Sequence, residues 1–422
     1  MADTEPDFFH DLDIINAPKP YFDAMRAKCP VHREPHQGTF MVTSYDTVME
    51  VLNRKDDMFS AAVSVVGPIP PLPFTPEGSD ITEQLEAHRP EMPWSAHLNC
   101  FDGPKHTAYR NFMSSLLTYK RLKANEDYLY GLVDRLIDGF IGKGACDAAE
   151  DFGHATATYA VSDLMGIPEA DRPKLIELLG APPSQIDGDA AHKIGPDPLA
   201  FLKPMIDGYL RDRIENPQAD LMTELVQGTL KDGTRPDFDV LSGLARFLFG
   251  AGQDTTARLI AMAVKMLAED HALQQFLREN PGRVPDFIEE VLRFDAPVKA
   301  IYRLARRNTT IGGVDVPAGS IMTVCLTAAS NDPAHFENPE KFDIDRPNVR
   351  DHLAFTKGAH ACLGAPLGRL ETRVAIERLL ARTKHFDLSE EHHGPAGART
   401  FRFEPTFSFR SLSDLHITFT PA

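Results

Sequence analysis

The stretch Leu241–Ala268 constrains the fold of this chain more than any other part of the sequence. It is apolar nearly all round, and its only charged residues are Arg246, Asp254, Arg258 and Lys265. A helix that is apolar on every face is normally buried on every face. The stretch therefore predicts a long helix that crosses the middle of a large protein.

Most of the region from Tyr109 to Asp295 has apolar residues three and four positions apart, which is typical of amphipathic helices. The clearest examples are Glu126–Phe140, Ala157–Met165 and Met222–Leu230. Two long segments lack this periodicity: Val65–Leu98, which holds seven prolines, and Ala181–Pro198. Loops of such length in a compact protein are usually functional or disordered.

The sequence changes character after Asp295. Short β-prone runs, separated by Gly and Pro, occupy Val298–Leu304, Thr310–Val316 and Ser320–Leu326. Later come a loop at Asp332–Arg350, a helix at Ala365–Arg382 and a hairpin-like alternation at Phe401–Phe419. No linker divides the chain, so we expect one mainly α domain with small β-sheets over residues 1–422.

Composition and charge exclude several classes of protein. The formal net charge of −17 argues against nucleic-acid binding, which needs clustered Lys and Arg. No signal peptide and no run of about 18 apolar residues are present, so we expect a soluble, cytoplasmic monomer. The five cysteines are scattered and form no CxxC pair, which argues against disulfides and a structural zinc site.

The strongest chemical signal is FTKGAHACLG, residues 355–364, directly before a predicted helix. Gly358 and Gly364 allow a tight turn that points backbone N–H groups at the sulfur of Cys362. The helix that follows adds the positive end of its dipole. These features suit a cysteine held as the thiolate ligand of a heme iron. The alternative is a buried inert thiol, the common fate of a free cysteine.

A second signal is GAGQDTT, residues 250–256, in the middle of the apolar helix. Its glycines cost helix stability but let a ligand lie against the backbone. A Thr hydroxyl can bond to a carbonyl one turn earlier, and Asp254 beside Thr255 can relay protons into a dry cavity. Asp254 could instead simply pair with Arg258, four residues further on.

Two weaker signals are pairs of polar residues on one helix face. Glu290 and Arg293 are three residues apart and can pair, as many surface residues of little energetic consequence do. His106 and Arg110 follow the helix-starting Pro104 and share a face that either holds a carboxylate or faces solvent.

In this order, the four segments resemble those of the cytochrome P-450 family of heme-thiolate monooxygenases, from about Pro20 to the C-terminus. Residues 355–364 fit the heme signature F-x-x-G-x-H-x-C-x-G at every fixed position. Residues 251–256 fit the pattern of an alanine or glycine, then glycine, any residue, an acid and two threonines. Glu290 and Arg293 fit E-x-x-R, and Phe342–Arg346 fits the segment whose arginine joins that pair.

The resemblance implies a role for each matched residue. It places heme b against Cys362, the axial ligand, and against Phe355, Gly358, Gly364 and Ala251, with the propionates held by His106, Arg110, Arg303 and His360. Asp254 and Thr255 match the acid–alcohol pair that delivers protons to bound dioxygen. Glu290, Arg293 and Arg346 match a structural triad that serves folding and heme retention.

The resemblance also implies the reaction, which is insertion of one oxygen atom of dioxygen into a C–H bond or a double bond. The sequence has no Gly-rich nucleotide motif and no flavin-sized extension, so we expect a separate ferredoxin, reduced by its reductase, to supply electrons. Acidic donors of that kind predict a local basic patch on the Cys362 face. Its candidate residues are Arg110, Lys357, Arg369 and Arg373.

The residues expected to line the substrate pocket are mostly apolar: Phe247, Gly250, Val298, Ala300, Ile301 and either Thr406 or Phe407. They suggest a terpenoid, steroid-like or aromatic substrate. Lys299 and His97 could anchor an acid or a carbonyl, although the sequence favours a solvent-facing position for both. Three alternatives stay open: a peroxide-driven peroxygenase, a heme sensor without enzymatic activity, and a heme-thiolate catalyst of another reaction such as isomerisation or dehydration.

Overall fold

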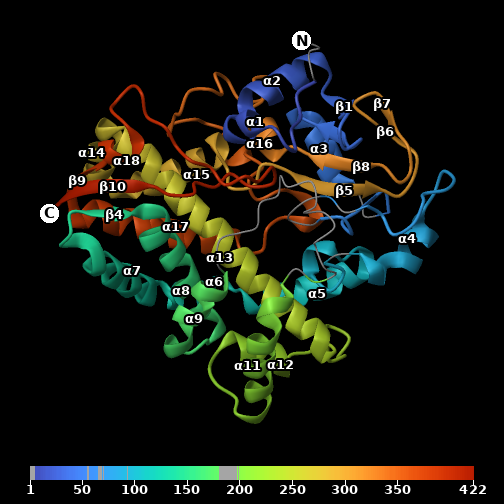
Figure 1. The fold of residues 1–422 in the computed structure, drawn as a ribbon. Coiled ribbons are helices and arrows are strands. Elements are labelled where there is room, and N and C mark those ends of the chain that lie inside the picture. The colour runs from blue at the N-terminus through green and yellow to red at the C-terminus, as the bar shows by residue number, and fades with distance from the viewer. Residues whose placement is uncertain are drawn as a thin grey trace.

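The computed structural model describes residues 5–54, 57–64, 69, 71–92, 94–179, 197 and 199–422. Helices dominate this part of the chain, and short strands form small sheets (Figure 1). The α-helices are α1 (Leu12–Asn16), α2 (Pro18–Lys28), α3 (Tyr45–Asn53), α4 (Thr82–His88), α5 (Gly103–Leu116), α6 (Tyr119–Ala124), α7 (Glu126–Ile141), α8 (Ala155–Met165), α9 (Arg172–Leu179), α11 (Lys203–Glu215), α12 (Leu221–Gln227), α13 (Phe238–Glu269), α14 (His271–Glu279), α15 (Val284–Phe294), α16 (Leu326–Ser330), α17 (Ala365–Arg382) and α18 (Glu390–His393).

Shorter helical turns and the strands complete the fold. The turns are η1 (Arg89–Glu91), η2 (Leu98–Cys100), η3 (Ala148–His154), η4 (Glu169–Asp171), η5 (Ala200–Leu202), η6 (Pro281–Arg283), η7 (Val349–Asp351) and η8 (Gly358–His360). The strands are β1 (Val31–Arg33), β2 (Phe40–Val42), β3 (Phe59–Ser60), β4 (Ala145–Asp147), β5 (Ile301–Ala305), β6 (Thr309–Ile311), β7 (Val314–Val316), β8 (Ile321–Val324), β9 (Thr383–Leu388) and β10 (His416–Pro421).

Helix α13 runs for 32 residues and crosses the middle of the molecule (Figure 1). Its bounds enclose the predicted stretch Leu241–Ala268. Most of its side chains are buried, including those of the charged residues Arg246 and Arg258. The prediction of a long central helix is therefore confirmed, with the helix starting three residues earlier and ending one residue later.

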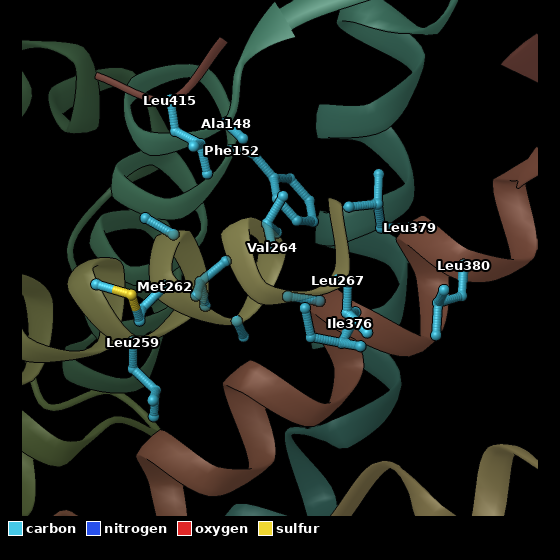
Figure 2. Close-up of a cluster of buried hydrophobic side chains, with 14 of the residues drawn as sticks. Ala148, Phe152, Leu259, Met262, Val264, Leu267, Ile376, Leu379, Leu380 and Leu415 are labelled. Carbon is cyan, nitrogen blue, oxygen red and sulfur yellow. The ribbon is translucent and has the colours of Figure 1, made fainter. Parts of the chain in front are cut away.

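The main hydrophobic core lies where α13 packs against α17 and η3. Figure 2 shows apolar side chains of these elements meeting at one place: Leu259, Met262, Val264 and Leu267 of α13, Ile376, Leu379 and Leu380 of α17, Ala148 and Phe152 of η3, and Leu415. All of them are buried. The C-terminal halves of α13 and α17 are thus fixed against each other, which sets where their N-terminal halves can separate.

The strands form three separate sheets. The largest has the order β1-β2-β8-β5-β3, in which only β2 and β8 are parallel. A second sheet has the order β4-β10-β9, and β6 pairs with β7. At the β6–β7 turn, Gly312 and Gly313 have φ angles of +54° and +83°, so the predicted run Thr310–Val316 is in fact a tight hairpin.

Two other predictions differ from the structure. The hairpin expected over Phe401–Phe419 is largely wrong, because β10 pairs with β9 and β4, and the only pairing inside that range is an isolated bridge between Phe403 and Leu412. The loop expected over Val65–Leu98 contains α4 and η1. The loop Ala181–Pro198 lies outside the described residues except for Asp197.

Candidate active site

Helices α13 and α17 pack against each other at Gly368 of α17. A Cβ atom at Gly368 would lie 3.4 Å from the hydroxyl oxygen of Thr256, so the missing side chain permits this contact. Nearer the start of α17, Cys362 is exposed, and so is Ala251 on α13, although the helix is buried at residues 241–246 and 256–264. Exposure of both side chains beside a packed crossing indicates an opening between the two helices.

The opening borders one section of α13, from residue 247 to residue 255. Phe247, Gly250, Ala251, Asp254 and Thr255 are partly or fully accessible there, whereas residues 249 and 253 are buried. Positions three to four residues apart share a helix face. One face of the central helix is therefore free to contact a ligand, and it carries the acid and the alcohol that the sequence singled out.

The loop before α17 is closed by backbone contacts around Cys362. The N–H of Cys362 donates to the carbonyl oxygen of Phe355 at 2.9 Å, and the hydroxyl of Thr356 donates to the carbonyl of His360 at 2.9 Å. Gly358 has a φ of +74°, and a Cβ atom there would collide with the carbonyl oxygen of Leu52. Both the backbone conformation and the available space therefore require glycine at this position.

Two opposing effects act on the pKa of the Cys362 thiol, and the larger one, desolvation, raises it. Protein crowds the thiol on the sides away from the opening, and this desolvation raises its pKa. Hydrogen bonds from the backbone N–H groups of Gly364 and Ala365, and the charges of Arg110 and Arg369, act in the opposite direction. The amides that the glycine-rich turn was expected to aim at the sulfur are thus in place to stabilise a thiolate.

Asp254 and Thr255 both make contacts within α13. The hydroxyl of Thr255 donates to the carbonyl oxygen of Ala251 at 2.8 Å, as expected for a threonine that bonds one turn back. Arg258 donates to Oδ1 of Asp254 through Nε at 3.0 Å and through Nη2 at 2.7 Å. Its Nη1 donates to Glu404 at 2.6 Å. The alternative that the sequence offered, an ion pair of Asp254 with Arg258, is therefore present. It coexists with the expected placement of Asp254 next to Thr255.

Three of the four cations expected at heme propionates lie together beside the cysteine loop. His106 and Arg110 are on α5, and the imidazole rings of His106 and His360 stack with centroids 3.9 Å apart. Arg110 donates to the carbonyl oxygen of Ala361 at 2.5 Å. His106 is buried, so its predicted alternative position on a solvent-facing helix surface is wrong.

The fourth cation, Arg303, lies on strand β5 of the largest sheet. Its Nη1 donates to the hydroxyl of Ser64 at 2.6 Å and to the carbonyl oxygen of Tyr302 at 2.7 Å. The side chain is buried. A buried guanidinium needs a counter-charge or several acceptors, and a bound carboxylate would supply the charge.

Glu290, Arg293 and Arg346 form a buried network behind the cysteine loop. Arg293 donates to both oxygens of Glu290, at 2.8 and 2.7 Å, and Arg346 approaches the same carboxylate at 3.4 Å. The backbone N–H of Asp343 adds a further hydrogen bond at 2.9 Å. Glu290 and Arg293 are 0% exposed, so the alternative of an unimportant surface pair is wrong.

The residues expected to line the substrate pocket fall into two groups. Phe247, Gly250, Val298 and Ile301 are partly accessible, whereas Ala300 and Thr406, as well as Phe407, are buried. Phe407 packs its ring against Phe9 with centroids 5.0 Å apart, which makes it part of the N-terminal core. The accessible group supplies an apolar lining from α13 and from the segment that enters β5.

Lys299 and His97 differ from their expected solvent-facing positions, because both are buried. The ammonium of Lys299 donates to the carbonyl oxygen of Thr406 at 2.7 Å, and desolvation holds its pKa well below the usual value. The imidazole of His97 lies between the carbonyl oxygen of Gly243, at 3.2 Å, and Asp197, at 3.0 Å. The polar atoms of both side chains are therefore engaged by the protein.

Sequence reasoning missed a second buried charge cluster next to the cysteine loop. Arg369 donates to both oxygens of Glu289, at 2.5 and 2.9 Å, and His352 Nε2 lies 3.2 Å from the same carboxylate. Burial alone would raise the pKa of Glu289, but Arg369 and His352 hold it at about 2. The guanidinium of Arg369 also lies over the ring of Phe355, 4.5 Å from its centroid. The sequence signal that could have revealed this cluster is the pair of adjacent acids, Glu289 and Glu290.

A buried acid at the helix crossing was missed as well. Glu371 of α17 is 1% exposed, and the hydroxyl of Thr256 on α13 is its hydrogen-bond partner. Burial raises the pKa of this carboxyl well above its ordinary value. Nothing in the spacing of α17 distinguishes Glu371 from a solvent-facing acid, because only the crossing with α13 covers it.

No helix in the described ranges is long and apolar enough to span a membrane. A family model described as Cytochrome P-450 matches residues 190–396. Cytochrome P-450 109 of Bacillus spizizenii is 33% identical over 371 residues, which cover 86% of this chain and 84% of the relative. Cytochrome P-450 144 of Mycobacterium tuberculosis is 29% identical over 387 residues, 90% of this chain and 86% of that one.

Solved structures agree with these sequence relatives. Cytochrome P-450 CYP150A6 of Mycobacterium marinum, in its substrate-free form, has a TM-score of 0.91 and 42% identity over 99% of both chains. P450BioI, solved with an acyl carrier protein that carries hexadec-9Z-enoic acid, has a TM-score of 0.80 and 26% identity, covering 96% of this chain and 99% of that one. The mainly helical fold with small sheets is thereby confirmed.

Proposed function

Because this chain belongs to the cytochrome P-450 family of monooxygenases, we propose that it inserts one oxygen atom of dioxygen into an apolar small molecule of terpenoid, steroid-like or aromatic type. Dioxygen, an organic substrate and a heme-thiolate centre follow from the family. The substrate class, heme b as the form of heme, and the electron donor are our proposals, as is a single catalytic domain over residues 1–422. The observation that carries the proposal is the opening between α13 and α17, with Cys362 exposed at it.

The residues at the opening fit a heme. Cys362 would ligate the iron through its thiolate, and the N–H groups of Gly364 and Ala365 would stabilise the charge on sulfur. Ala251 leaves α13 free of a bulky side chain where a heme would be held. When bound, heme b would supply the oxygen chemistry, and the protein would bind, orient and supply protons.

The cations beside the cysteine loop would hold the heme propionates. His106, Arg110 and His360 lie together, and Arg303 comes from β5. Two propionates cannot be buried without charge partners, which gives a reason for cations to turn inward in a chain of net charge −17. Phe355 and Gly358 would shape the loop that carries Cys362.

Asp254 and Thr255 would move protons from the surface of α13 inward to the opening. Two of the three guanidinium nitrogens of Arg258, Nε and Nη2, contact Oδ1 of Asp254 and not Oδ2. Oδ2 would take up a proton from water at the surface of α13, and the hydroxyl of Thr255 would pass it inward. Thr255 can do so because its own hydrogen is directed to the carbonyl of Ala251 and can be reoriented without moving the backbone.

The substrate would lie along the accessible section of α13. Phe247 and Gly250 would contact it from α13, Val298 and Ile301 from the segment entering β5, and Ala300 and Thr406 would stand behind them. This apolar lining favours burial of a hydrocarbon skeleton over a charged substrate. Glu290, Arg293 and Arg346 would keep the cysteine loop in place and take no part in the chemistry.

Electrons would come from a separate ferredoxin reduced by its own reductase. Of the proposed basic patch, Arg369 is paired with Glu289, and Arg373 with Glu126 and Glu377. Lys357, in the cysteine loop, has no ion pair with a described acid and is partly accessible. We therefore rank Lys357 first among the donor-contacting cations.

The test is turnover of a ligand found by spin-state screening of a terpene, steroid and aromatic library against the heme-loaded protein. With NADPH, a plant-type ferredoxin and its reductase, we expect a product that carries one oxygen atom from labelled dioxygen. Shifts only with highly polar compounds would contradict the substrate class. Peroxide-driven turnover that survives Thr255→Ala and exceeds donor-driven turnover would favour a peroxygenase instead.

A further inference from the structure

Three side chains that can bind a metal meet outside the active site, where the N-terminal segment reaches the turn between β1 and β2. Asp7, Glu34 and His36 each bring one possible ligand atom, and the three atoms lie within 4.8 Å of one another. No other group of three or more His, Cys, Asp and Glu side chains is so closely spaced among the described residues. The group shares no residue with the proposed active site.

The N-terminal segment holds Asp7 in a fixed position. Phe8 and Phe9 follow it directly, are 1% and 2% exposed, and anchor the segment in the N-terminal core. The backbone N–H of Phe9 donates to Oδ1 of Asp7 at 2.9 Å. Nδ1 of His10 lies 2.8 Å from Oδ2 and donates to it, because a carboxylate can only accept. The carboxylate of Asp7 is therefore oriented by the protein itself.

Glu34 is a buried carboxylate that lacks a charge partner. It is 0% exposed, and no Lys, Arg or His in the described ranges forms an ion pair with it. The backbone N–H groups of His36 and Gln37 donate to its two oxygens at 3.0 and 2.6 Å, which leaves one lone pair on each oxygen. A buried charge is costly unless it is paired or coordinates a metal. A cation at the remaining lone pairs would offset that cost.

The imidazole of His36 is oriented as the imidazole of a metal ligand is. Its Nε2 lies 3.1 Å from the carbonyl oxygen of Glu5. Since a carbonyl can only accept, Nε2 carries the hydrogen, and the neutral ring has its lone pair on Nδ1. This Nδ1 faces Oδ2 of Asp7 at 3.7 Å, so two acceptors point at each other. Histidines that ligate a metal almost always donate their other ring N–H to a carbonyl, a carboxylate or water.

We propose that Asp7, Glu34 and His36 bind one Zn²⁺ ion, which connects the N-terminal segment to the β1–β2 turn. An imidazole nitrogen and carboxylate oxygens are ligands that zinc takes in proteins, and the two carboxylates neutralise its charge. Ligand atoms about 2 Å from a tetrahedral ion lie about 3.3 Å apart, close to the separation of Asp7 and His36. These two side chains are 22% and 32% exposed, so the ion can enter from solvent and a water molecule can complete its coordination.

The test is calorimetric titration of Zn²⁺ into the heme-loaded protein, which carries no purification tag and has been treated with EDTA. We expect saturation at one ion per chain. His36→Gln changes a partly exposed side chain, and Glu34→Gln keeps the size of the buried one. Each should weaken binding at least ten-fold. The matched control is His385→Gln, which removes an exposed histidine beside Asp387 and should leave the affinity unchanged.

Two further measurements locate the ion. X-ray absorption at the zinc edge should show nitrogen and oxygen ligands with the outer-shell scattering of an imidazole, and His36→Gln should remove that scattering. Zn²⁺ should also slow amide hydrogen exchange roughly ten-fold over residues 7–11 and 34–39, which the ion would hold together, and leave α17 unchanged.

Several results would overturn the proposal. Absence of saturable binding at millimolar Zn²⁺ would leave Asp7 and His36 as an ordinary ion pair. Equal affinity of the wild type and His36→Gln would show that other groups bind the ion, and sulfur scattering would place it at a cysteine. Slowed exchange outside the two segments alone would do the same. If Glu34→Gln fails to fold, His36→Gln decides, because its side chain is not part of the core.

Discussion

The cysteine loop and the segment around His97 are stabilised in different ways. The loop over residues 355–364 is closed by its own backbone and supported by the buried carboxylates Glu289 and Glu290. The segment around His97 is connected to α13 through side chains, since His97 and Arg246 of α13 both contact Asp197. The cysteine loop is therefore held rigidly, whereas the other segment depends on a few long-range polar contacts.

The difference suggests a division of roles. A metal ligand has to keep one geometry, and backbone closure together with 0% exposed ion pairs gives that rigidity. A substrate has to enter, and contacts that depend on one partly exposed carboxylate, Asp197, can open without unfolding the core. Substitutions that disturb one of the two segments at a time test this difference.

Glu290→Gln should have the largest effect on stability. It leaves Arg293 buried with its charge uncompensated, which costs about 3–5 kcal/mol of the free energy of unfolding. Denaturant unfolding of the heme-loaded protein measures this loss. The matched control is Arg283→Leu, which breaks the exposed pairs to Asp286 and Asp345 and should cost less than about 1 kcal/mol. Equal losses of unfolding free energy in the two variants would show that the buried pair contributes no more to the rigidity of the cysteine loop than an exposed pair.

Glu289, which supports the cysteine loop, should make the free energy of unfolding depend on pH in the acid range. Its pKa is about 2 in the folded protein against an ordinary value of 4.5, and the shift corresponds to about 3 kcal/mol of stability. Because the folded pKa is depressed, the contribution is complete above pH 4.5 and disappears as the pH falls toward 2. The difference in unfolding free energy between the wild type and Glu289→Gln should therefore be constant near neutral pH and shrink below pH 4.5. A difference that stayed constant down to pH 3.5 would contradict this assignment.

Asp197→Asn should affect the segment over residues 94–101 and leave the cysteine loop unchanged. It removes the charge partner of Arg246, which is buried, and weakens the contact to His97. We expect amide hydrogen exchange over residues 94–101 to accelerate roughly ten-fold, equivalent to about 1.4 kcal/mol, with no change over α17. Acceleration in both regions would show that the two sides open together.

Lys357→Glu should have the smallest effect, and only on the electron donor. A surface ion pair is worth about 0–1 kcal/mol, so the apparent KM for ferredoxin should rise roughly two- to five-fold at low salt. The rise should disappear at high ionic strength, where surface charges are screened. Lys231→Glu, in the exposed loop between α12 and α13, should leave that KM unchanged. An effect that is independent of salt would argue against electrostatic docking at the cysteine loop.

The parts that could be predicted from sequence are those with local patterns. The apolar run over Leu241–Ala268 determined the central helix, and the glycines around Cys362 determined the turn of its loop. The pairing of Glu290 with Arg293 follows from their spacing on α15. Each of these features depends on residues a few positions apart, so periodicity and backbone preference are sufficient to find them.

The parts that could not be predicted depend on contacts between distant segments. Nothing near Lys299 indicates that Thr406 supplies a carbonyl to its ammonium, and nothing near His97 points to Asp197, one hundred residues away. The burial of these two side chains was therefore predicted wrongly. The partners of β10 were also missed, because strand alternation does not specify which strands pair.

The central claim is that Cys362 provides the thiolate ligand of a heme iron, and one spectrum tests it most directly. The reduced, CO-bound wild type should show the red-shifted Soret band of a thiolate-ligated heme, and Cys29→Ser should keep it. Cys362→Ser should lose that band while still binding heme through the remaining contacts. A thiolate band that survives in Cys362→Ser, or is absent from the heme-loaded wild type, would contradict the account.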